Sequence, residues 1–195
     1  VGISWRTAPV AIRERLAFRE DEVPGLVERL RAQPEVAEAM LISTCNRVEV
    51  CAVVKGSTEE GLEAVKNFLI EYQPQLPAGS LTPCLYLYSA GDCLRHLFRV
   101  ASSLDSMIIG EGEILGQVRD AWEFARAAGA TGSRLNLLFR HAIEAGKRAR
   151  TETDIARGTA SVSHAAVEMA VEQLGDLAGS RVLVLGAGEM AEGMA

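Results

Sequence analysis

One stretch of the chain decides the fold: Leu41-Ile42-Ser43-Thr44-Cys45-Asn46-Arg47-Val48-Glu49. The apolar run Met40-Leu41-Ile42 at its start is typical of a buried strand. From Arg47 to Val54 apolar and other residues alternate, which predicts a second strand with one apolar face, formed by Val48, Val50, Ala52 and Val54. The connection between the two strands carries Cys45 at a sheet end, where catalytic groups are often found.

The segments on either side of this hairpin predict the rest of a small sandwich. Strands are expected over 1–5 and at Leu85–Tyr88, and helices near 10–17, from Glu20 to Arg31 and from Ser57 to Tyr72. Pro24 and the acidic residues before it suit the first turn of the second helix. Strands that alternate with helices in this order predict an α+β sandwich over roughly residues 1–90.

Helices dominate after residue 90. They are predicted over 92–102, 112–128, 133–150 and 162–174, where apolar residues recur at helical spacing. A strand over 181–185 follows, and the turn Gly186-Ala187-Gly188-Glu189-Met190-Ala191 comes directly after it. A glycine-rich turn in this context binds the pyrophosphate of a dinucleotide, so Gly186, Gly188 and Ala191 are predicted to bind a cofactor.

Composition limits the classes of protein to which the chain can belong. Its 195 residues, 48% hydrophobic and 24% charged, predict a globular protein. The sequence contains neither an apolar run of the about 18 residues that a bilayer requires nor a signal pattern, so we expect a cytoplasmic protein with no membrane contact. It starts without Met and stops in the first turn of a predicted helix, so we expect a piece of a longer chain.

Net charge and the spacing of the cysteines further limit the kinds of binding site that we expect. The four cysteines include no CxxC pair, which argues against a zinc site, and a chain of this length does not need disulfides. A net charge of −6 argues against tight, sequence-independent binding of nucleic acid. Residues 134–157 nevertheless carry a local charge of +3, which fits an RNA contact and a solvated helix face equally well.

Cys45 is the candidate nucleophile. An unperturbed cysteine has a pKa of about 8.5, and the cation of Arg47, two residues away, would raise the small thiolate fraction at neutral pH. Thr44 and Asn46 add hydrogen-bonding groups beside it. The alternative is a half-buried structural cysteine in a polar turn. Packing roles are expected for the other cysteines, Cys51, Cys84 and Cys93.

Two further side chains have both a structural and a functional interpretation. His96 lies beside the apolar stripe of its predicted helix, so it is either a satisfied structural histidine or a site group. Glu111 stands between Gly110 and Gly112, which would let the backbone turn tightly and aim the carboxylate inward. The alternative for Glu111 is a capping residue in a helix–loop–helix joint.

Several of these segments together resemble one family, the glutamyl-tRNA reductases. The resemblance rests on the segment 43–47, on the block 104–117 with its Leu104-Asp105-Ser106, Gly110-Glu111 and Ile114-Leu115-Gly116-Gln117, and on the turn 186–190. Arg6-Thr7-Ala8-Pro9 and Ala160-Ser161-Val162-Ser163 are similar to further family segments. They occur in the family's order and spacing over essentially the whole chain.

The resemblance implies an enzyme that uses NADPH to reduce the glutamate of glutamyl-tRNA to glutamate-1-semialdehyde, the first step of tetrapyrrole (5-aminolevulinate) biosynthesis. It also implies that Cys45 attacks the aminoacyl ester and forms a thioester, which hydride then reduces. The implied domains are a catalytic glutamyl-tRNA-binding domain over 1–155, a linking (spinal) helix over 156–178 and the truncated start of a Rossmann NADPH domain over 179–195.

Residue roles and partners follow from the same resemblance. His96 would be the second catalytic residue, close to the reacting carbonyl. The glutamyl group would be held by Thr44, Arg47, Ser106, Glu111 and Gln117. Of these, Arg47 suits its side-chain carboxylate and Glu111 its α-ammonium group. A homodimer of the full-length protein and contact with the downstream aminomutase are also implied. Without most of the NADPH domain, the chain is expected to perform only acyl transfer or ester hydrolysis.

The chain departs from the family pattern at Ser103, where Gly is expected, and at Ser4-Trp5, where Asn-His is expected. Two alternatives also stay open. One is a different Rossmann oxidoreductase in which Cys45 is structural. The other is a non-catalytic module that binds tRNA or a protein partner, which predicts binding without a covalent adduct.

Overall fold

The computed structural model describes residues 1–183 apart from residues 20, 74, 78 and 157–161. Its centre is an antiparallel sheet in the order β1 (Gly2–Ser4), β3 (Arg47–Val54), β2 (Val36–Ser43). β2 and β3 form the predicted hairpin, in which Ser43 is opposite Val48 and Met40 is opposite Cys51. The prediction of two strands joined at Cys45 is therefore confirmed.

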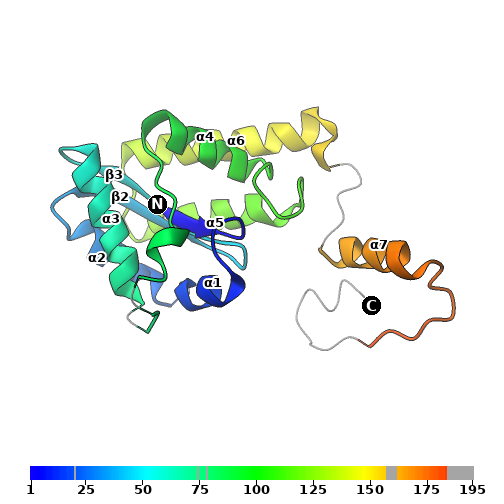
Figure 1. Cartoon of the computed structure of the whole chain (residues 1–195). Coiled ribbons are helices and arrows are strands. Elements are labelled where there is room, and N and C mark those ends of the chain that lie inside the picture. The colour runs from blue at the N-terminus through cyan, green and yellow to red at the C-terminus, as the bar shows by residue number, and fades with distance from the viewer. Residues whose placement is uncertain (20, 74, 78, 157–161, 184–195) are drawn as a thin grey trace.

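Seven α-helices are present among the described residues. Three of them belong to the first half of the chain: α1 (Val10–Leu16), α2 (Val23–Arg31) and α3 (Thr58–Tyr72). The others are α4 (Ala90–Ala101), α5 (Glu113–Ala127), α6 (Ser133–Glu152) and α7 (Val162–Leu174). Figure 1 shows α4 and α6 on one side of the sheet and α1 on the other. Within the described part of the chain, no helix is both long and apolar enough to cross a membrane.

Burial along β2 shows that the sheet is covered on both faces. Ala39, Met40, Leu41 and Ile42 follow one another, and none is more than 4% exposed. Successive side chains of a strand point to opposite faces, so four consecutive buried residues require packing on both sides. Helix α2 and helix α5 both contact β2. The α+β sandwich with a helical second half is thus confirmed, whereas the Rossmann part is not described.

The fourth strand predicted at Leu85–Tyr88 is wrong. This segment makes one isolated bridge, in which Gly2 N donates to Tyr86 O (3.1 Å) and Tyr86 N donates to Gly2 O (2.9 Å). β1 offers an edge of only three residues, and the 3-10 helix Thr82–Cys84 and the start of α4 at Ala90 confine the segment on either side. The bridge still places Tyr86 beside the edge of the sheet.

Helix α7 ends at a glycine. Gly175 has a φ of 81°, a left-handed conformation that glycine adopts without steric cost, and its N–H donates to Val171 O (2.8 Å). Of the linking helix predicted over 156–178, the described helix therefore covers 162–174. The preceding 3-10 helix, Asp154–Ala156, separates it from α6.

The strand predicted over 181–185 is not formed in its described part. Residues 181–183 have no regular structure, and Val182 and Leu183 are 77% and 81% exposed. A strand needs a neighbour for its backbone N–H and C=O groups, and no described segment pairs with this one. Gly186, Gly188 and Ala191 lie outside the described residues, so the dinucleotide turn stays a prediction.

Helices α4, α5 and α6 meet at Gly146. A Cβ atom at this position would lie 2.3 Å from the carbonyl oxygen of Ala101 and 2.8 Å from Cδ1 of Leu115. These are distances that a real Cβ does not tolerate, so the glycine in the middle of α6 permits the close approach of the other two helices. The approach fixes where α4 and α5, and the loop between them, lie over the sheet.

The Gly146→Ala variant is expected to lower the free energy of unfolding by about 1–3 kcal/mol, because overpacking outweighs the better helix propensity of alanine. Gly116→Ala in α5 is the matched control, since nothing lies within 4 Å of its added Cβ. This control should raise stability by up to about 1 kcal/mol. Urea denaturation measures both, and stabilisation by both substitutions would contradict the close approach at Gly146.

Candidate active site

Cys45 and Asn46 form the tip of the β2–β3 hairpin, and Thr44 holds its shape. Thr44 N donates to Arg47 O (2.8 Å), and its Oγ1 accepts from Asn46 N and Arg47 N at 3.1 Å each. Trp5 N donates to Asn46 O (2.8 Å), which ties the tip to the residue after β1. A hydroxyl that accepts two backbone N–H groups fixes a turn. It leaves the Cys45 side chain exposed.

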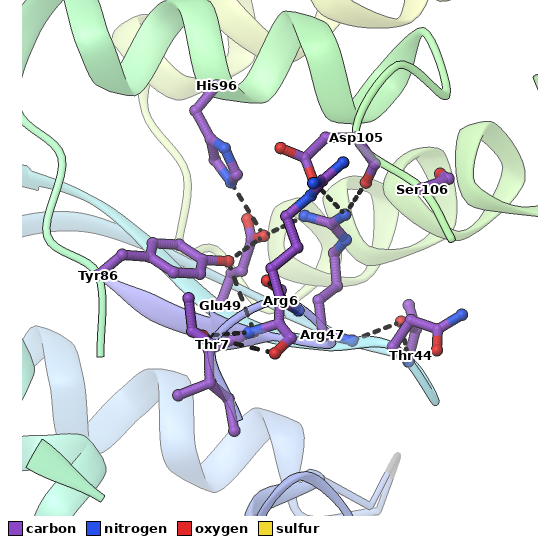
Figure 2. Close-up of polar contacts among 12 residues, drawn as sticks. Arg6, Thr7, Thr44, Arg47, Glu49, Tyr86, His96, Asp105 and Ser106 are labelled. Atoms are coloured by element: carbon purple, nitrogen blue, oxygen red, sulfur yellow. Dashed lines mark hydrogen bonds and ion pairs between the residues drawn. The ribbon is translucent and has the colours of Figure 1, made fainter. Parts of the chain in front are cut away.

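The cation next to Cys45 is Arg13 of α1, and not Arg47 as predicted. Arg13 Nε donates to Cys45 O (3.3 Å) and its Nη1 donates to Ala8 O (3.1 Å). Arg47 begins β3, and its side chain extends over the sheet to Glu49 and Asp105, as Figure 2 shows. Arg47 is therefore close to Cys45 in sequence, but its positive charge is directed towards Glu49 and Asp105.

The pKa of the Cys45 thiol is raised, and not lowered as the sequence suggested. Partial desolvation by the surrounding chain is the main cause, and the negative charge of Glu113 is the next. A backbone hydrogen bond lowers the pKa in part, Glu111 raises it, and Arg13 lowers it. At neutral pH the resting nucleophile is therefore the thiol, and it must lose its proton when it attacks.

Arg47 is the centre of a buried ionic network. Its side chain is 1% exposed and bonds Glu49 Oε1 through Nη1 (2.6 Å). Its Nη2 donates to the backbone carbonyl of Asp105 and lies 3.5 Å from Oδ1 of the same residue. Arg6 Nε lies 3.5 Å from that Asp105 oxygen on the outer side. Two arginines and two carboxylates thus meet in one balanced cluster, drawn in Figure 2.

Glu49 connects this cluster to His96. Its Oε1 accepts from Tyr86 OH (2.6 Å) and lies 3.0 Å from His96 Nε2. Burial would raise the pKa of Glu49, but the hydrogen bond from His96 and the charge of Arg47 outweigh it and lower the pKa to about 2. Because an ionised carboxylate only accepts, Nε2 of His96 is assigned the proton. Burial, followed by the charge of Glu49, raises the pKa of Tyr86.

His96 is a partly buried group held on several sides. Its ring lies 5.3 Å from the ring of Tyr86 and 4.9 Å from that of Tyr88, centroid to centroid. The described contacts of His96 go to Glu49 and these tyrosines, whereas those of Cys45 go to Arg13 and the start of α5. Among the described residues, no hydrogen bond or ion pair joins the two predicted catalytic residues.

Glu111 caps α5, as its structural interpretation predicts. Its carboxylate accepts from Glu113 N (2.9 Å), Ile114 N (3.3 Å) and Ser106 Oγ (3.4 Å). A carboxylate at a helix N-terminus satisfies backbone N–H groups that have no intrahelical partner. Ser106 and Glu111, both predicted to bind substrate, are thus brought together.

The departure from the family pattern at Ser103 has a structural explanation. Ser103 is 1% exposed with a φ of 56°, a conformation that costs a residue other than glycine roughly 1–2 kcal/mol. Its hydroxyl donates to Glu111 O (2.6 Å), which offsets part of that cost. The position requires a left-handed backbone, which is why glycine is expected there.

Gln117 faces a hollow beside the hairpin. It lines a pocket of about 270 Å³ between β2 and α5, together with Ser43, Phe18 and Phe124. Cys45 does not line this pocket, although Ser43 lies only two residues before it. Ser43 Oγ accepts from Phe18 N (3.0 Å), so its hydroxyl is already engaged. Within the described residues, no group of three or more metal-ligating side chains gathers.

Sequence reasoning missed four members of the ionic network: Glu49, Tyr86, Asp105 and Arg6. A signal for Glu49 was present, because residues 47 and 49 point to the same face of a strand, opposite Val48 and Val50. An arginine and a glutamate on one strand face of a buried hairpin predict an ion pair. No local signal exists for the other three, which come from distant segments.

Comparison with known proteins identifies the family. The family described as "Glutamyl-tRNAGlu reductase, N-terminal domain" matches residues 1–153. The chain belongs to the glutamyl-tRNA reductase family. It is 47% identical to the glutamyl-tRNA reductase of Syntrophotalea carbinolica over 98% of its own length and 43% of that protein. For the glutamyl-tRNA reductase of Synechococcus elongatus the identity is 43%, over 97% of this chain and 45% of the relative.

A solved family structure has a similar fold. The glutamyl-tRNA reductase from Methanopyrus kandleri aligns with a TM-score of 0.68 at 36% identity, over 99% of this chain and 44% of that one. The chain thus spans less than half the length of the relatives it matches. The comparisons establish family membership, and the activity of the longer proteins stays a proposal for this chain.

Replacement of Glu49 by Gln tests the network through pH. The folded-state pKa of Glu49, about 2, lies below its ordinary 4.5. The pair therefore adds stability above pH 4.5 that is lost as pH falls towards 2, and this amounts to about 3 kcal/mol. The Glu49→Gln variant should have a lower free energy of unfolding at pH 7. That free energy should also fall less between pH 4.5 and 2 than it does in the unsubstituted protein.

Urea denaturation across this pH range measures the effect. The control is Glu152→Gln, which removes the carboxylate of an exposed pair with Arg148 and should leave the pH dependence nearly unchanged. Equal pH dependence in the Glu49→Gln variant and the unsubstituted protein would contradict the ionised, buried state of Glu49.

Proposed function

We propose that the full-length protein reduces glutamyl-tRNA to glutamate-1-semialdehyde with NADPH, for tetrapyrrole biosynthesis, and that this chain performs the acyl transfer. The observation that carries the proposal is Cys45, an exposed thiol at the tip of a fixed hairpin inside the matched family domain. The other three cysteines are buried or half-buried.

The proposed reaction is covalent catalysis. The Cys45 sulfur attacks the carbonyl carbon of the glutamyl ester, the new C–S bond forms, and the C–O bond to the terminal ribose breaks. The ribose oxygen of the released tRNA takes up the proton that the thiol loses and becomes a hydroxyl. An ester resists hydride because its alkoxy oxygen donates electrons to the carbonyl, whereas sulfur donates less, so the thioester divides one difficult step into two easier ones.

Arg47 is proposed to bind the side-chain carboxylate of the glutamyl group, in exchange for Asp105. Its bond to Glu49 is short (2.6 Å), but its contact with the Asp105 carboxylate is 3.5 Å, longer than a charge-assisted hydrogen bond. Asp105 has a second cation in Arg6, which can keep it neutralised. The exchange would keep the charges of the buried cluster balanced.

The remaining site residues are proposed in supporting roles. Thr44 positions Cys45 through the turn. Glu111, whose charge raises the pKa of Cys45, would meet the α-ammonium group, and Ser106 would assist through its hydrogen bond to Glu111. Gln117 would contact the glutamyl group from α5. His96 would act near the carbonyl after the thioester forms, with its orientation set by Glu49.

The NADPH domain, the homodimer and contact with the downstream aminomutase belong to the longer protein and stay proposals, as does a cytoplasmic location. NADPH would supply the hydride. Gly186, Gly188 and Ala191 are proposed to bind its pyrophosphate on the grounds of sequence alone. This chain would therefore transfer or hydrolyse the glutamyl group without reducing it.

Radiolabelled glutamyl-tRNA tests the acyl transfer directly. After incubation and acid quench, the chain should carry label that thiols or hydroxylamine release, and uncharged tRNA should appear in equal amount. Cys45→Ser should lose at least 100-fold of the labelling rate, since a serine hydroxyl is far less readily ionised. Cys84→Ser is the matched control, because that thiol is buried and donates to Ser80 O.

Unlabelled protein with fully charged tRNA would contradict acyl transfer by this chain and favour a non-catalytic binding module. Equal labelling of Cys45→Ser and the unsubstituted chain would instead exclude Cys45 as the acceptor.

Glu113→Gln tests the charge environment of the nucleophile. Glu113 raises the pKa of Cys45, so removal of its charge lowers that pKa and increases the thiolate fraction at any pH below it. The rate of Cys45 alkylation by iodoacetamide should then rise, and its pH profile should move to lower pH. Glu123→Gln, an exposed position further along α5, is the control. A profile shifted to higher pH would contradict the assignment.

A further inference from the structure

Two thiols outside the proposed site lie on facing elements. Cys51 belongs to β3 and Cys93 to the first turn of α4, and both are half-buried. They line the same cavity of about 230 Å³, which Tyr88 and Ser89 also line. Both cysteines are predicted from the sequence to have packing roles, and the proposed acyl transfer uses neither of them.

The backbone geometry makes the two thiols neighbours of the Glu49–His96 pair. Cys51 follows Glu49 by two residues in β3, so both side chains point to the same face of the strand. Cys93 precedes His96 by three residues in α4, which places both on one face of the helix. Since Glu49 and His96 are 3.0 Å apart, the same interface places Cys51 and Cys93 on facing elements, where both line one cavity.

The interaction between the two thiols gives them different pKa values. A hydrogen bond from the Cys51 thiol lowers the pKa of Cys93 to about 6, against the effect of burial. The positive charges of the Val1 ammonium group and of His96 lower it further, whereas the charge of Glu49 raises it. The same hydrogen bond, together with burial, raises the pKa of Cys51. Cys93 is thus the more readily ionised and the more nucleophilic of the two thiols.

We propose that Cys51 and Cys93 form an oxidisable dithiol that reacts with the disulfide of a low-molecular-weight thiol and closes into a Cys51–Cys93 disulfide. In the first step the Cys93 thiolate attacks the disulfide, a mixed disulfide forms, and one thiolate leaves. In the second step Cys51 loses its proton and attacks the Cys93 sulfur, which releases the second thiol. The protein loses two electrons and the small disulfide gains them.

The bond would join β3 to α4 one helical turn from His96. It requires the two sulfur atoms to come within about 2.05 Å of each other. Neither remaining cysteine competes as a partner by position, since Cys84 donates to Ser80 O and Cys45 is at the hairpin tip. The inference needs no tRNA or NADPH, so it stands or falls separately from the proposed acyl transfer.

The test is incubation of the purified chain with oxidised glutathione, followed by acid quench, alkylation of free thiols, tryptic digestion and mass spectrometry. The expected product is a cross-link between the peptides that contain Cys51 and Cys93, with loss of two hydrogens and reversal by dithiothreitol. Cys84 shares its tryptic peptide with Cys93, so the cross-link must persist in Cys84→Ser. The thermal midpoint should rise on oxidation and fall again on reduction.

The serine variants assign the two roles. Cys51→Ser should stop at a stable glutathione adduct on Cys93, and Cys93→Ser should reduce modification of Cys51 at least tenfold. Phenylarsine oxide, which bridges neighbouring thiols without oxidation, should bind the unsubstituted chain in a one-to-one ratio and neither serine variant. A persistent adduct or a free thiol at Cys93 in the unsubstituted chain, under conditions that modify Cys45, would overturn the proposal. So would a disulfide from Cys51 to any other cysteine.

Discussion

The buried pair of Arg47 and Glu49 is the interaction on which the rest of this structure depends. A guanidinium that is 1% exposed is stable only if nearby carboxylates and carbonyls satisfy it, and here they come from β3 itself and from the α4–α5 loop. Glu49 lies on the same strand, Asp105 in the α4–α5 loop, and Tyr86 and His96 join through Glu49. One charge in β3 therefore fixes the helical layer over the sheet.

The α4–α5 loop connects this network to the proposed nucleophile. Asp105 contacts Arg47 at one point of the loop, and Glu111 influences the pKa of Cys45 at another. The left-handed backbone of Ser103 and the cap of α5 by Glu111 together hold the loop in shape. A substrate carboxylate that displaced Asp105 would therefore act on the segment that also surrounds the thiol. The close approach at Gly146 fixes both helices that bound this loop.

The raised pKa of Cys45 means that its sulfur is a protonated thiol before the substrate binds. The nearby charges at the start of α5 oppose ionisation, and Arg13 compensates only in part. The thiol is thus protected from non-specific reaction at rest, and the α-ammonium group of a bound glutamyl residue would neutralise part of the opposing negative charge. In contrast, the thiols at Cys51 and Cys93 are polarised by each other, in a position that the acyl transfer does not use.

The sequence by itself determined the elements with strong local signals. It gave the β2–β3 hairpin with Cys45 at its tip and the bounds of α7, because alternation and helical spacing are local properties of the chain. Tertiary structure decided the rest. Leu85–Tyr88 has strand composition but only a three-residue edge to pair with, and the charge beside Cys45 comes from Arg13, remote in sequence. Charge interactions and ladder pairing depend on distances in space, which only the packed fold sets.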